Sequence, residues 1–321
     1  MAQPADSRLG AALAVTAAFC FAGKTILAKL AYREGMDPLS LICLRMILAG
    51  GIFAVILAAN TLRGRWRPQD LPPAKWAAIV LLGVFGYYLC SFLDFAGLWY
   101  IDASLGRMIL FLYPTMTVVI DAAATGTRVG GRTWTALGVS YAGLLMMMSP
   151  HLGTPGPGFY KGCGLVFLSA ALYAFYLIGV DRQFGRSRMP MLISVTMMVS
   201  AASVLAHYGA VREFGALSGF SGKAYLYIVL LAVFSTVVPI YAMSAGIALL
   251  GASRAAVYNM SGPIMTLVMG AVLLGERLGP LEIAGMVLII LGVSRIGNRR
   301  GGGDGKSGSQ AASGKPETAG K

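Results

Sequence analysis

The stretch DASLGRMILFLYPTMTVVIDAAATGTR, residues 102–128, returns later in the chain as GASRAAVYNMSGPIMTLVMGAVLLGER, residues 251–277. At an offset of 149 residues (263 minus 114), both copies have a proline in mid-segment and end on Gly-x-Arg. The matched pairs are Ala103/Ala252, Ser104/Ser253, Pro114/Pro263, Met116/Met265, Thr117/Thr266, Gly126/Gly275 and Arg128/Arg277, and the same offset pairs Phe85/Phe234, Gly97/Gly246 and Gly143/Gly292. Apolar sequence of low complexity does not readily place a proline and a Gly-x-Arg in register twice. The chain is therefore predicted to be a duplicated hydrophobic unit.

The composition indicates an integral membrane protein. Apolar residues make up 57% of the chain and charged residues 12%, and the mean hydropathy is +0.71. A helix that spans a bilayer needs about 20 apolar residues. Apolar runs between clusters of charge predict ten such helices, at 10–30, 38–59, 75–97, 102–124, 132–149, 162–181, 190–209, 224–247, 251–274 and 280–296. We therefore expect an all-α membrane protein whose two five-helix repeats cover residues 10–149 and 160–297.

The net charge of +13 is explained by membrane topology. An even number of spans places both termini on one side of the membrane. If that side is the cytoplasm, most Lys and Arg residues are cytoplasmic, which is the positive-inside bias. The basic residues left on the outer side are Arg33, Lys161, Arg212, Lys223 and Arg277. Five spans per unit is an odd number, so the second repeat is expected to have the opposite orientation, as in many secondary transporters.

Several other classes of protein and site are not supported by the sequence. No basic patch interleaved with aromatic residues predicts nucleic-acid binding. The stretch 9–22 after Arg8 resembles a signal peptide, but its removal would leave nine spans and break the pairing of the halves. No disulfide, metal site or cofactor is predicted, because the cysteines lie within spans and the two histidines are far apart; these residues are Cys20, Cys43, Cys90, Cys163, His151 and His207.

The composition also predicts the nature of the C-terminal segment and leaves the oligomeric state open. Residues 298–321 are expected to form a disordered cytoplasmic tail. Gly138 and Ala142 form a small-xxx-small pair of the kind found at helix contacts. Both a monomer and a homodimer are compatible with this pattern.

Ionisable side chains inside the predicted spans are the sharpest feature of the first repeat, since a charge at the bilayer centre costs about 3 kcal/mol even on insertion scales. They are Lys24, Arg45, Asp94, Arg107 and Asp121. The direction of each helix places the first four in one band in the outer half of the bilayer, and Asp121 near the cytoplasmic end. In one interpretation Arg45 and Asp94 form a structural ion pair while Lys24 and Arg107 extend to the interface. In the other, all four line the outer end of a substrate cavity.

Polar stripes and prolines favour a cavity in the middle of the membrane. The polar residues at helical spacing are Tyr87, Ser91 and Asp94 on the third predicted helix, Ser169, Tyr173 and Tyr176 on the sixth, and Tyr258 and Ser261, beside Asn259, on the ninth. Pro114, Pro239 and Pro263 interrupt the fourth, eighth and ninth helices. A proline frees a backbone carbonyl, and such breaks in membrane helices serve as binding sites or hinges, or are only kinks.

The chain resembles the EamA family of the drug/metabolite transporter superfamily. The residues that carry the resemblance are the DPLSLICLRMILAG stretch at 37–50, the Ala-Gly-Leu and Ala-Ser-Leu triplets at 96–98 and 103–105 before Pro114, and Leu-Gly-Glu-Arg at 274–277. The likeness covers residues 10–297. It implies a carrier of the bacterial inner membrane with a central cavity between its halves, working by alternating access. Members of the family move amino acids, other metabolites or toxic compounds, often outward.

Compared residue by residue, the family pattern is met at Arg45, Pro114, Pro263 and Gly275-Glu276-Arg277, and is broken at two places. Thr127 stands where a Glu would precede Arg128. Gly106 stands where relatives have an acid before the basic residue of the fourth helix. Arg107 therefore lacks its nearest partner. Either Asp94 or Asp102 replaces that acid, or the cation is kept for an anionic group of the substrate.

The charge balance favours an organic anion or a zwitterionic amino acid as substrate. Lys24, Arg45 and Arg107 against Asp94 leave +2 (three minus one) in the outer band. We expect Tyr88, Tyr173 and Tyr258 to pack against the substrate. The absence of a GxxxxGK[ST] motif argues against ATP-driven transport. Proton coupling through Asp94, exchange and facilitated diffusion stay open.

Three alternatives belong to other functional classes. An exporter of drugs or lipophilic compounds, or a flippase-type helper for lipid-linked sugars, fits the same fold, although a flippase should have lipid-facing grooves. An intramembrane enzyme would need a nucleophile with its base, or a metal cluster. No HExxH or GxSxG motif accompanies Lys24 and Asp94, so we predict no catalytic residue.

Overall fold

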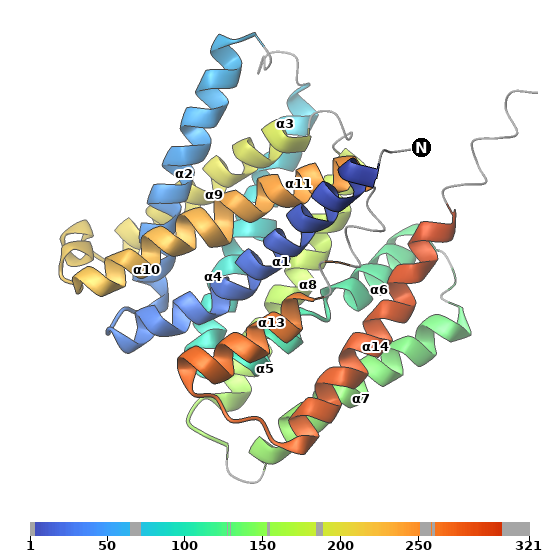
Figure 1. Cartoon of the computed structure of the whole chain (residues 1–321). Helices are drawn as coiled ribbons and strands as arrows, with labels where there is room; N and C mark the ends of the chain where they lie inside the picture. Colours follow the sequence, from blue (N-terminus) through green and yellow to red (C-terminus); the bar gives the residue numbers. More distant parts are fainter. Residues whose placement is uncertain are drawn as a thin grey trace, which may run out of the picture.

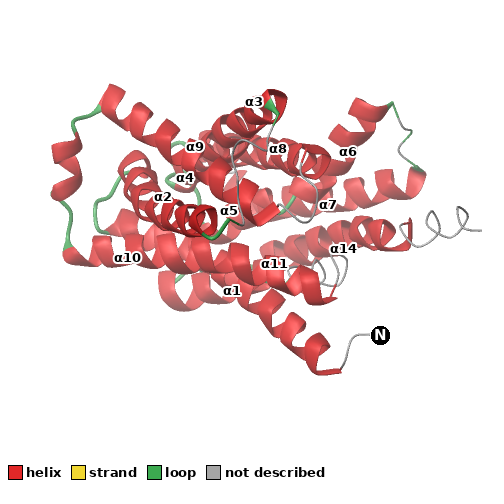
Figure 2. Ribbon diagram, turned by 90° about the horizontal axis from the view of Figure 1, so that it is seen from above, coloured by secondary structure: helices red, strands yellow, loops and turns green. Residues whose placement is uncertain are grey.

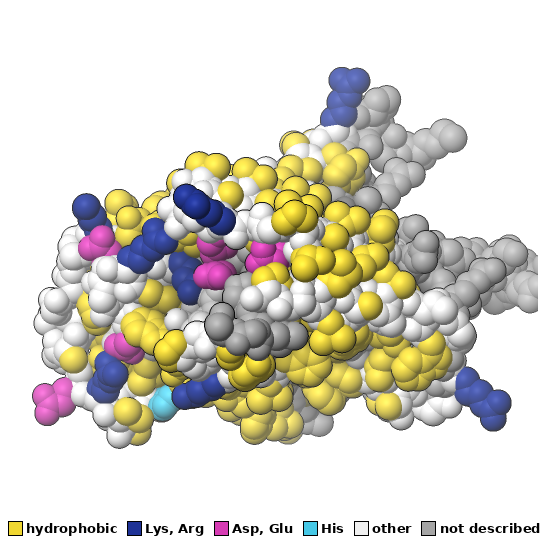
Figure 3. All heavy atoms as spheres, turned by 90° about the horizontal axis from the view of Figure 1, so that it is seen from below, with side chains coloured by type: hydrophobic (Ala, Val, Ile, Leu, Met, Phe, Trp, Pro, Cys, Tyr) yellow, Lys and Arg dark blue, Asp and Glu magenta, His cyan; other side chains and the backbone are white. Residues whose placement is uncertain are grey.

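The computed structural model describes residues 4–64, 72–126, 128, 130–152, 155–183, 189–250, 258 and 261–303. Within these residues every regular element is a helix (Figures 1 and 2), and the structure is 88% helical. Large apolar side chains such as Val55, Trp134 and Leu145 are more than half exposed. Hydrophobic side chains cover much of the face in Figure 3, with charged side chains gathered in one part of it. Such a surface suits contact with lipid rather than water.

The helices follow the predicted order. The first predicted repeat contains α1 (Pro4–Arg33), α2 (Pro38–Leu62), α3 (Pro73–Leu81), η2 (Leu82–Leu89), α4 (Cys90–Leu98), α5 (Ala103–Leu110), α6 (Tyr113–Thr125) and α7 (Gly131–Leu152). The second contains α8 (Phe159–Gln183), α9 (Met189–Val211), η3 (Phe214–Ser218), α10 (Gly222–Ala232), η4 (Val233–Val237), α11 (Val238–Leu250), α13 (Gly262–Met269), η5 (Gly270–Leu274) and α14 (Pro280–Gly303). Helix α14 runs past residue 297, and residues 304–321 of the predicted tail lie outside the described residues.

Seven described helical segments are long and apolar enough to cross a membrane. They are Arg8–Arg33, Pro38–Leu62, Lys75–Leu98, Ala103–Thr125, Phe159–Gly179, Met191–Val211 and Gly222–Met243. Shorter apolar helices occupy Gly262–Leu274 and Pro280–Ser294, and α7 coincides with the fifth predicted span. These findings establish an all-α, multi-pass architecture. The number of ten spans and their inverted orientation remain predictions.

Packing between the two halves is symmetric under the 149-residue offset. Helix α1 packs along α10 and α11, and α4 packs along α8. The offset places α1 on α8 and α4 on α11, so the α1–α11 and α4–α8 contacts are equivalent, with the two halves exchanged. Helix α2 packs on α9 and α7 on α14, each with its own counterpart, and α5 packs on α13 of the other half (Figure 1). At the α7–α14 contact, a Cβ added to Gly143 would lie 2.5 Å from Gly285 O, and one added to Gly292 would lie 2.7 Å from Ala136 O. The repeated glycines therefore let these two helices approach closely.

The repeated stretch folds as predicted around its proline and glycine. A turn at Phe111 and Leu112 separates α5 from α6, and Pro114 is the second residue of α6. Pro263 has the same place in α13. Proline is tolerated there because the first helical N–H groups have no partner within the helix. Gly126 and Gly275 end the two copies at φ 67° and 73°, in the left-handed region that favours glycine.

Two π-helical segments occupy equivalent positions in the halves, and the sequence did not reveal either. Segment η2 covers Leu82–Leu89 and η4 covers Val233–Val237, and they include the matched residues Phe85 and Phe234. Pro239 directly follows η4 as the second residue of α11, so the predicted interruption of this helix is a π segment rather than a gap. Segments of this kind often occur at functional sites.

Candidate functional site

The four ionisable residues predicted to share one band come together at the centre of the bundle. Lys24 Nζ on α1 lies 2.6 Å from Asp94 Oδ2 on α4, and the side chains are 17% and 4% exposed. Arg45 on α2 is not the ion-pair partner of Asp94. Its guanidinium lies 4.9 Å from the centroid of the Phe95 ring, and Lys24 Nζ lies 5.2 Å from the same ring. The predicted Arg45–Asp94 pair is therefore wrong in its cation, because α1 rather than α2 presents its charge to the carboxylate.

Arg107 is the cation of this group that lies between the two halves. It belongs to α5, one turn before the break at Phe111. A Cβ added to Gly262 of α13 would lie 3.0 Å from Arg107 Nη2 and 3.7 Å from Ala18 O of α1. Arg107 interacts electrostatically with Tyr113, Asp94 and Tyr173. One interpretation of the sequence required the Arg107 guanidinium to extend to the membrane interface. The structure places it inside the bundle instead.

A group of tyrosines borders this charge. Tyr113 and Tyr173 meet edge to face with ring centroids 4.9 Å apart, Tyr173 stacks on Tyr176 at 6.0 Å, and Tyr87 meets Tyr176 edge to face at 6.0 Å. Ser169, on the same helix as Tyr173, donates to Cys90 O at 2.8 Å. Three predicted polar positions, Tyr87, Tyr173 and Tyr176, thus form one aromatic group between η2, α6 and α8.

Several buried polar atoms have no hydrogen-bond partner within the described part of the chain. They are Arg45 Nε, Asp94 Oδ2, Arg107 Nε, Ser200 Oγ, Ser235 Oγ and Tyr241 Oη. Asp94 Oδ2 has only its contact with the Lys24 ammonium. Buried polar atoms are normally satisfied by protein, water or ligand. Sequence reasoning missed Ser200, Ser235 and Tyr241, and the signal that could have found Ser235 was its place in the segment just before Pro239.

Tyr88 and Tyr258 are not joined to the tyrosine group within the described part of the chain. Tyr88 shares a hydrogen bond of 2.7 Å between its hydroxyl and His207 Nδ1, towards α9. Tyr258 is 39% exposed, and its carbonyl accepts from Ser261 Oγ at 2.7 Å. Asn259 lies outside the described residues. Ser91 is buried on α4, in the turn before Asp94. The four cysteines are buried, free thiols.

A second polar group lies where α1 and α4 end and α5 begins. Glu276 of the second half accepts hydrogen bonds from Ala103 N at 2.7 Å, Ser104 N at 3.1 Å and Ser104 Oγ at 2.5 Å, so it caps the first turn of α5. Arg33 Nη2 donates to Leu274 O at 2.5 Å. Helix α5 has no side-chain cap from its own Asp102. The Glu of the Gly-Glu-Arg motif therefore joins the two halves.

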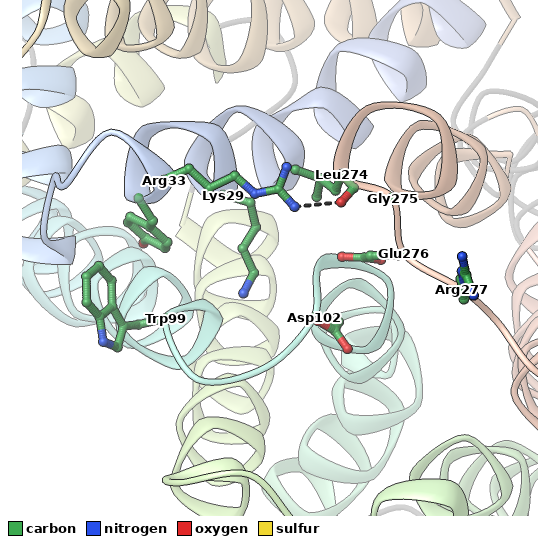
Figure 4. Close-up of a pocket in the computed structure, with 9 residues that line it drawn as sticks. Lys29, Arg33, Trp99, Asp102, Leu274, Gly275, Glu276 and Arg277 are labelled. Carbon is green, nitrogen blue, oxygen red and sulfur yellow. Dashed lines mark hydrogen bonds between the residues drawn. The ribbon is translucent and has the colours of Figure 1, made fainter.

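A cavity of about 520 Å³ lies beside this cap. Its walls come from the ends of α1 and α4 and from the 274–277 segment (Figure 4). The lining residues are Lys29, Tyr32, Arg33, Trp99, Asp102, Leu274, Gly275, Glu276 and Arg277. The volume falls within the range of about 300–1,000 Å³ that is usual for small-molecule sites. Of these residues, a sequence motif singled out only the four from Leu274 to Arg277.

An ion pair at the same end of the bundle joins the halves near the start of α2. Asp37 accepts from Leu39 N and Ser40 N, both at 3.0 Å, and its Oδ2 lies 2.7 Å from Arg212 Nη1. Burial alone would raise the pKa of Asp37. The hydrogen bonds from Ser40 and the charge of Arg212 outweigh this effect and lower the pKa below its usual value.

Comparisons with known proteins agree with this architecture. The sequence profile of the EamA-like transporter family matches residues 8–149 and again residues 160–297. The uncharacterized transporter YcbK of Bacillus subtilis (strain 168) is 30% identical over 283 residues, which cover 83% of this chain and 85% of that protein. An uncharacterized transporter of Archaeoglobus fulgidus is 24% identical over 271 residues, which cover 83% and 90%. A solved crystal structure shares the fold with a TM-score of 0.62 at 16% identity, over 89% of this chain and 94% of that one.

Proposed function

Since the chain belongs to the EamA-like transporter family, we propose that it exports small organic anions and zwitterions, in particular amino acids, across the bacterial cytoplasmic membrane by alternating access. Its family and its apolar helices show that the chain is a multi-pass membrane transporter. Transporters of this kind act without a catalytic site. The substrate class, the direction and the site residues are the proposal.

The observation that carries the substrate class is the surplus of buried positive charge. Lys24 is neutralised by Asp94 at 2.6 Å, which leaves Arg45 and Arg107 without an ion-pair partner among the described residues. Arg45 rests on Phe95, and such a contact partly compensates a desolvated cation. Arg107 lies beside Gly262 of the other half and has an unsatisfied Nε. A carboxylate of the substrate would satisfy it through a charge-assisted hydrogen bond.

The tyrosine group supplies the apolar part of the proposed site. Tyr113 and Tyr173 lie within electrostatic range of Arg107, so a ligand held at the guanidinium would meet their rings. Tyr87 and Tyr176 extend the same aromatic surface. Aromatic walls with one fixed charge suit an amino acid better than a small inorganic anion. The proposed site therefore comprises Arg107, the tyrosines and the nearby Lys24–Asp94 pair.

The breaks in the helices support movement at this site. Arg107 is followed after about one turn by the α5–α6 break at Phe111, just before Pro114, and its neighbour Gly262 precedes Pro263. We propose that these prolines and Pro239 serve as hinges about which the halves rock. The exchange-symmetric packing of the halves supports ten spans in two inverted repeats. The excess of Lys and Arg on one side of this topology supports termini in the cytoplasm. In this topology Arg107 faces the outer half of the membrane.

Flux measurements in proteoliposomes test the proposal. Labelled amino acids, organic acids and lipophilic cations are compared, each with and without an imposed proton gradient. We expect saturable movement of amino acids or organic acids, and a decrease of about tenfold or more in Arg107→Gln, since a hydrogen bond to a charged group contributes about 1.5–3 kcal/mol. Arg63→Gln, which alters an exposed arginine at the end of α2, is the matched control and should keep its flux.

The same measurement separates the alternative functions. Movement of lipophilic cations alone would replace the proposal by a drug exporter. Absence of flux for all three classes, together with exchange of labelled lipid-linked sugar between leaflets, would replace it by a flippase helper. Unchanged amino-acid flux in Arg107→Gln would remove Arg107 from the site.

A further inference from the structure

The cavity beside Glu276 contains a lysine that makes no direct hydrogen bond within the described part of the chain. Lys29 lies within electrostatic range of Asp102 and Glu276, which also line the cavity. In Figure 4 the Lys29 side chain points into the space between Trp99 and Asp102, while Arg33 is directed to Leu274 and Arg277 lies at the edge. The cavity therefore presents one ammonium group to a ligand.

The other walls of the cavity are fixed in place. Glu276 is held by three donors at the start of α5, and Arg33 by Leu274 O. Trp99 and Tyr32 meet edge to face with centroids 5.1 Å apart, and Tyr32 Oη donates to Phe95 O at 2.8 Å. A wall whose side chains are already ordered loses little entropy when a ligand binds. These features are those of a formed binding site rather than of a gap between loops.

We propose that this cavity is a second substrate site, which binds a zwitterionic amino acid with an apolar or aromatic side chain. The carboxylate of the ligand pairs with Lys29, and its side chain packs on Trp99 and Tyr32. The lining carries both signs of charge, and a zwitterion is complementary to both. The basic residues are Lys29, Arg33 and Arg277, and the acidic residues are Asp102 and Glu276. The inference rests on the proposed function for its substrate class.

The position of the cavity gives the site its role. Its walls come from both halves, since α1 and α4 belong to the first repeat and 274–277 to the second. It lies at the end of α1 opposite to the N-terminus (Figure 1). Lys24 lies nine positions (33 minus 24) before the last residue of α1, and Arg107 lies within α5. In the proposed topology this end faces outward. The cavity then holds the amino acid at the outer end of the pathway, after it leaves Arg107.

Trp99 provides a local probe of this site. A variant of the full chain with Trp66→Phe, Trp76→Phe and Trp134→Phe keeps Trp99 alone. Its emission is titrated with L-phenylalanine, N-acetyl-L-phenylalanine and 2-phenylethylamine, which share a benzyl group and differ in charge. We expect a saturable change with L-phenylalanine, weaker binding of the N-acetyl compound and no saturation with the amine. Lys29→Gln should weaken L-phenylalanine binding at least tenfold, and Lys29→Arg should keep it within about threefold, since the charge remains.

Controls keep this inference distinct from the proposed function. Lys161→Gln removes an exposed lysine outside the cavity and should leave the titration unchanged. Arg107→Gln should lose flux but keep the Trp99 titration. Loss of all flux with an intact, Lys29-dependent titration would leave the second site standing and remove the proposed function. A Trp99 response that is absent, or equal in Lys29→Gln and its parent, would refute the second site even if flux is normal.

Discussion

Two lysines on one helix have opposite surroundings. Lys24 is mostly buried and lies 2.6 Å from the carboxylate of Asp94. Lys29, five positions along α1 (29 minus 24), faces a cavity and makes no ion pair with a described residue. The first ammonium is satisfied by the fold itself. The second leaves its charge available to a ligand.

This difference separates structural charge from charge available for binding. A buried ion pair that loses one member leaves the other charge without compensation, so its residues report on stability. A cation at the edge of a cavity contributes little to folding because it gives up few contacts when it is replaced. We therefore expect substitutions at the two lysines to differ first in stability and only then in transport.

The largest effect is expected at the Lys24–Asp94 pair. Lys24→Met and Asp94→Asn should each lower the free energy of unfolding by about 3 kcal/mol or more, because each leaves buried charge unpaired. Asp94→Asn should lower the free energy of unfolding by more than Lys24→Met does, since it leaves Lys24, Arg45 and Arg107 close together without a carboxylate. The measurement is denaturant unfolding in detergent micelles.

A double-mutant cycle and a matched lysine complete this test. The double variant Lys24→Met/Asp94→Asn should lose less unfolding free energy than the two single variants lose in sum. Lys29→Met, on the same helix, should change the unfolding free energy by less than about 0.5 kcal/mol. Equal losses in Lys24→Met and Lys29→Met would erase the distinction between the two lysines.

An intermediate effect is expected at the cap that joins the halves. Glu276→Gln keeps the shape of the side chain and removes its charge, so the three hydrogen bonds at the start of α5 weaken by about 1–2 kcal/mol in total. Amide exchange of Ala103 and Ser104, followed by mass spectrometry, should become about tenfold faster. Glu213→Gln, at an exposed glutamate without a cap hydrogen bond, is the matched control. Unchanged exchange in Glu276→Gln would mean that the cap does not hold the halves together.

The smallest effect is expected at Asp37, where both partners are accessible to solvent. The pKa of Asp37 is lowered in the folded state, so its charge contributes stability above the unfolded pKa of about 3.9, and this contribution is lost as the pH falls through the folded pKa. Asp37→Asn keeps an N-cap residue and removes the charge. It should be less stable than the wild type by under about 1 kcal/mol at pH 7, and by a smaller amount at pH 3, which is below the unfolded pKa. Thermal unfolding at both pH values checks this; a difference that grows on acidification would contradict it.

The sequence predicted the parts of the fold that depend on local chemistry. The repeat at 102–128 and 251–277 predicted an interruption of the helix at Pro114, because proline acts on its own backbone. The depth of each charge along its helix follows from counting residues, so the gathering of Lys24, Arg45, Asp94 and Arg107 was predictable. The membrane architecture followed from the apolar runs.

The partners of those charges could not be predicted in the same way. The sequence favoured Arg45 over Lys24 for Asp94, because it gives depth but neither the rotation of a helix nor its neighbours. Tyr88 was assigned to the substrate on depth alone, yet its hydroxyl meets His207 of another helix. Ser235 and the π segments η2 and η4 likewise depend on packing that a single span does not encode.

The sequence by itself thus determined that this protein is a duplicated bundle of membrane helices with a surplus of positive charge inside. Hydropathy and repeat register are properties of the chain that need no tertiary contacts. Only the tertiary structure decided that Lys24 neutralises Asp94, that Arg107 lies against the second half, and that Glu276 caps α5 beside a cavity containing Lys29. Each of these contacts joins residues from different helices, and it is the packing of one helix against another that sets which side chains meet.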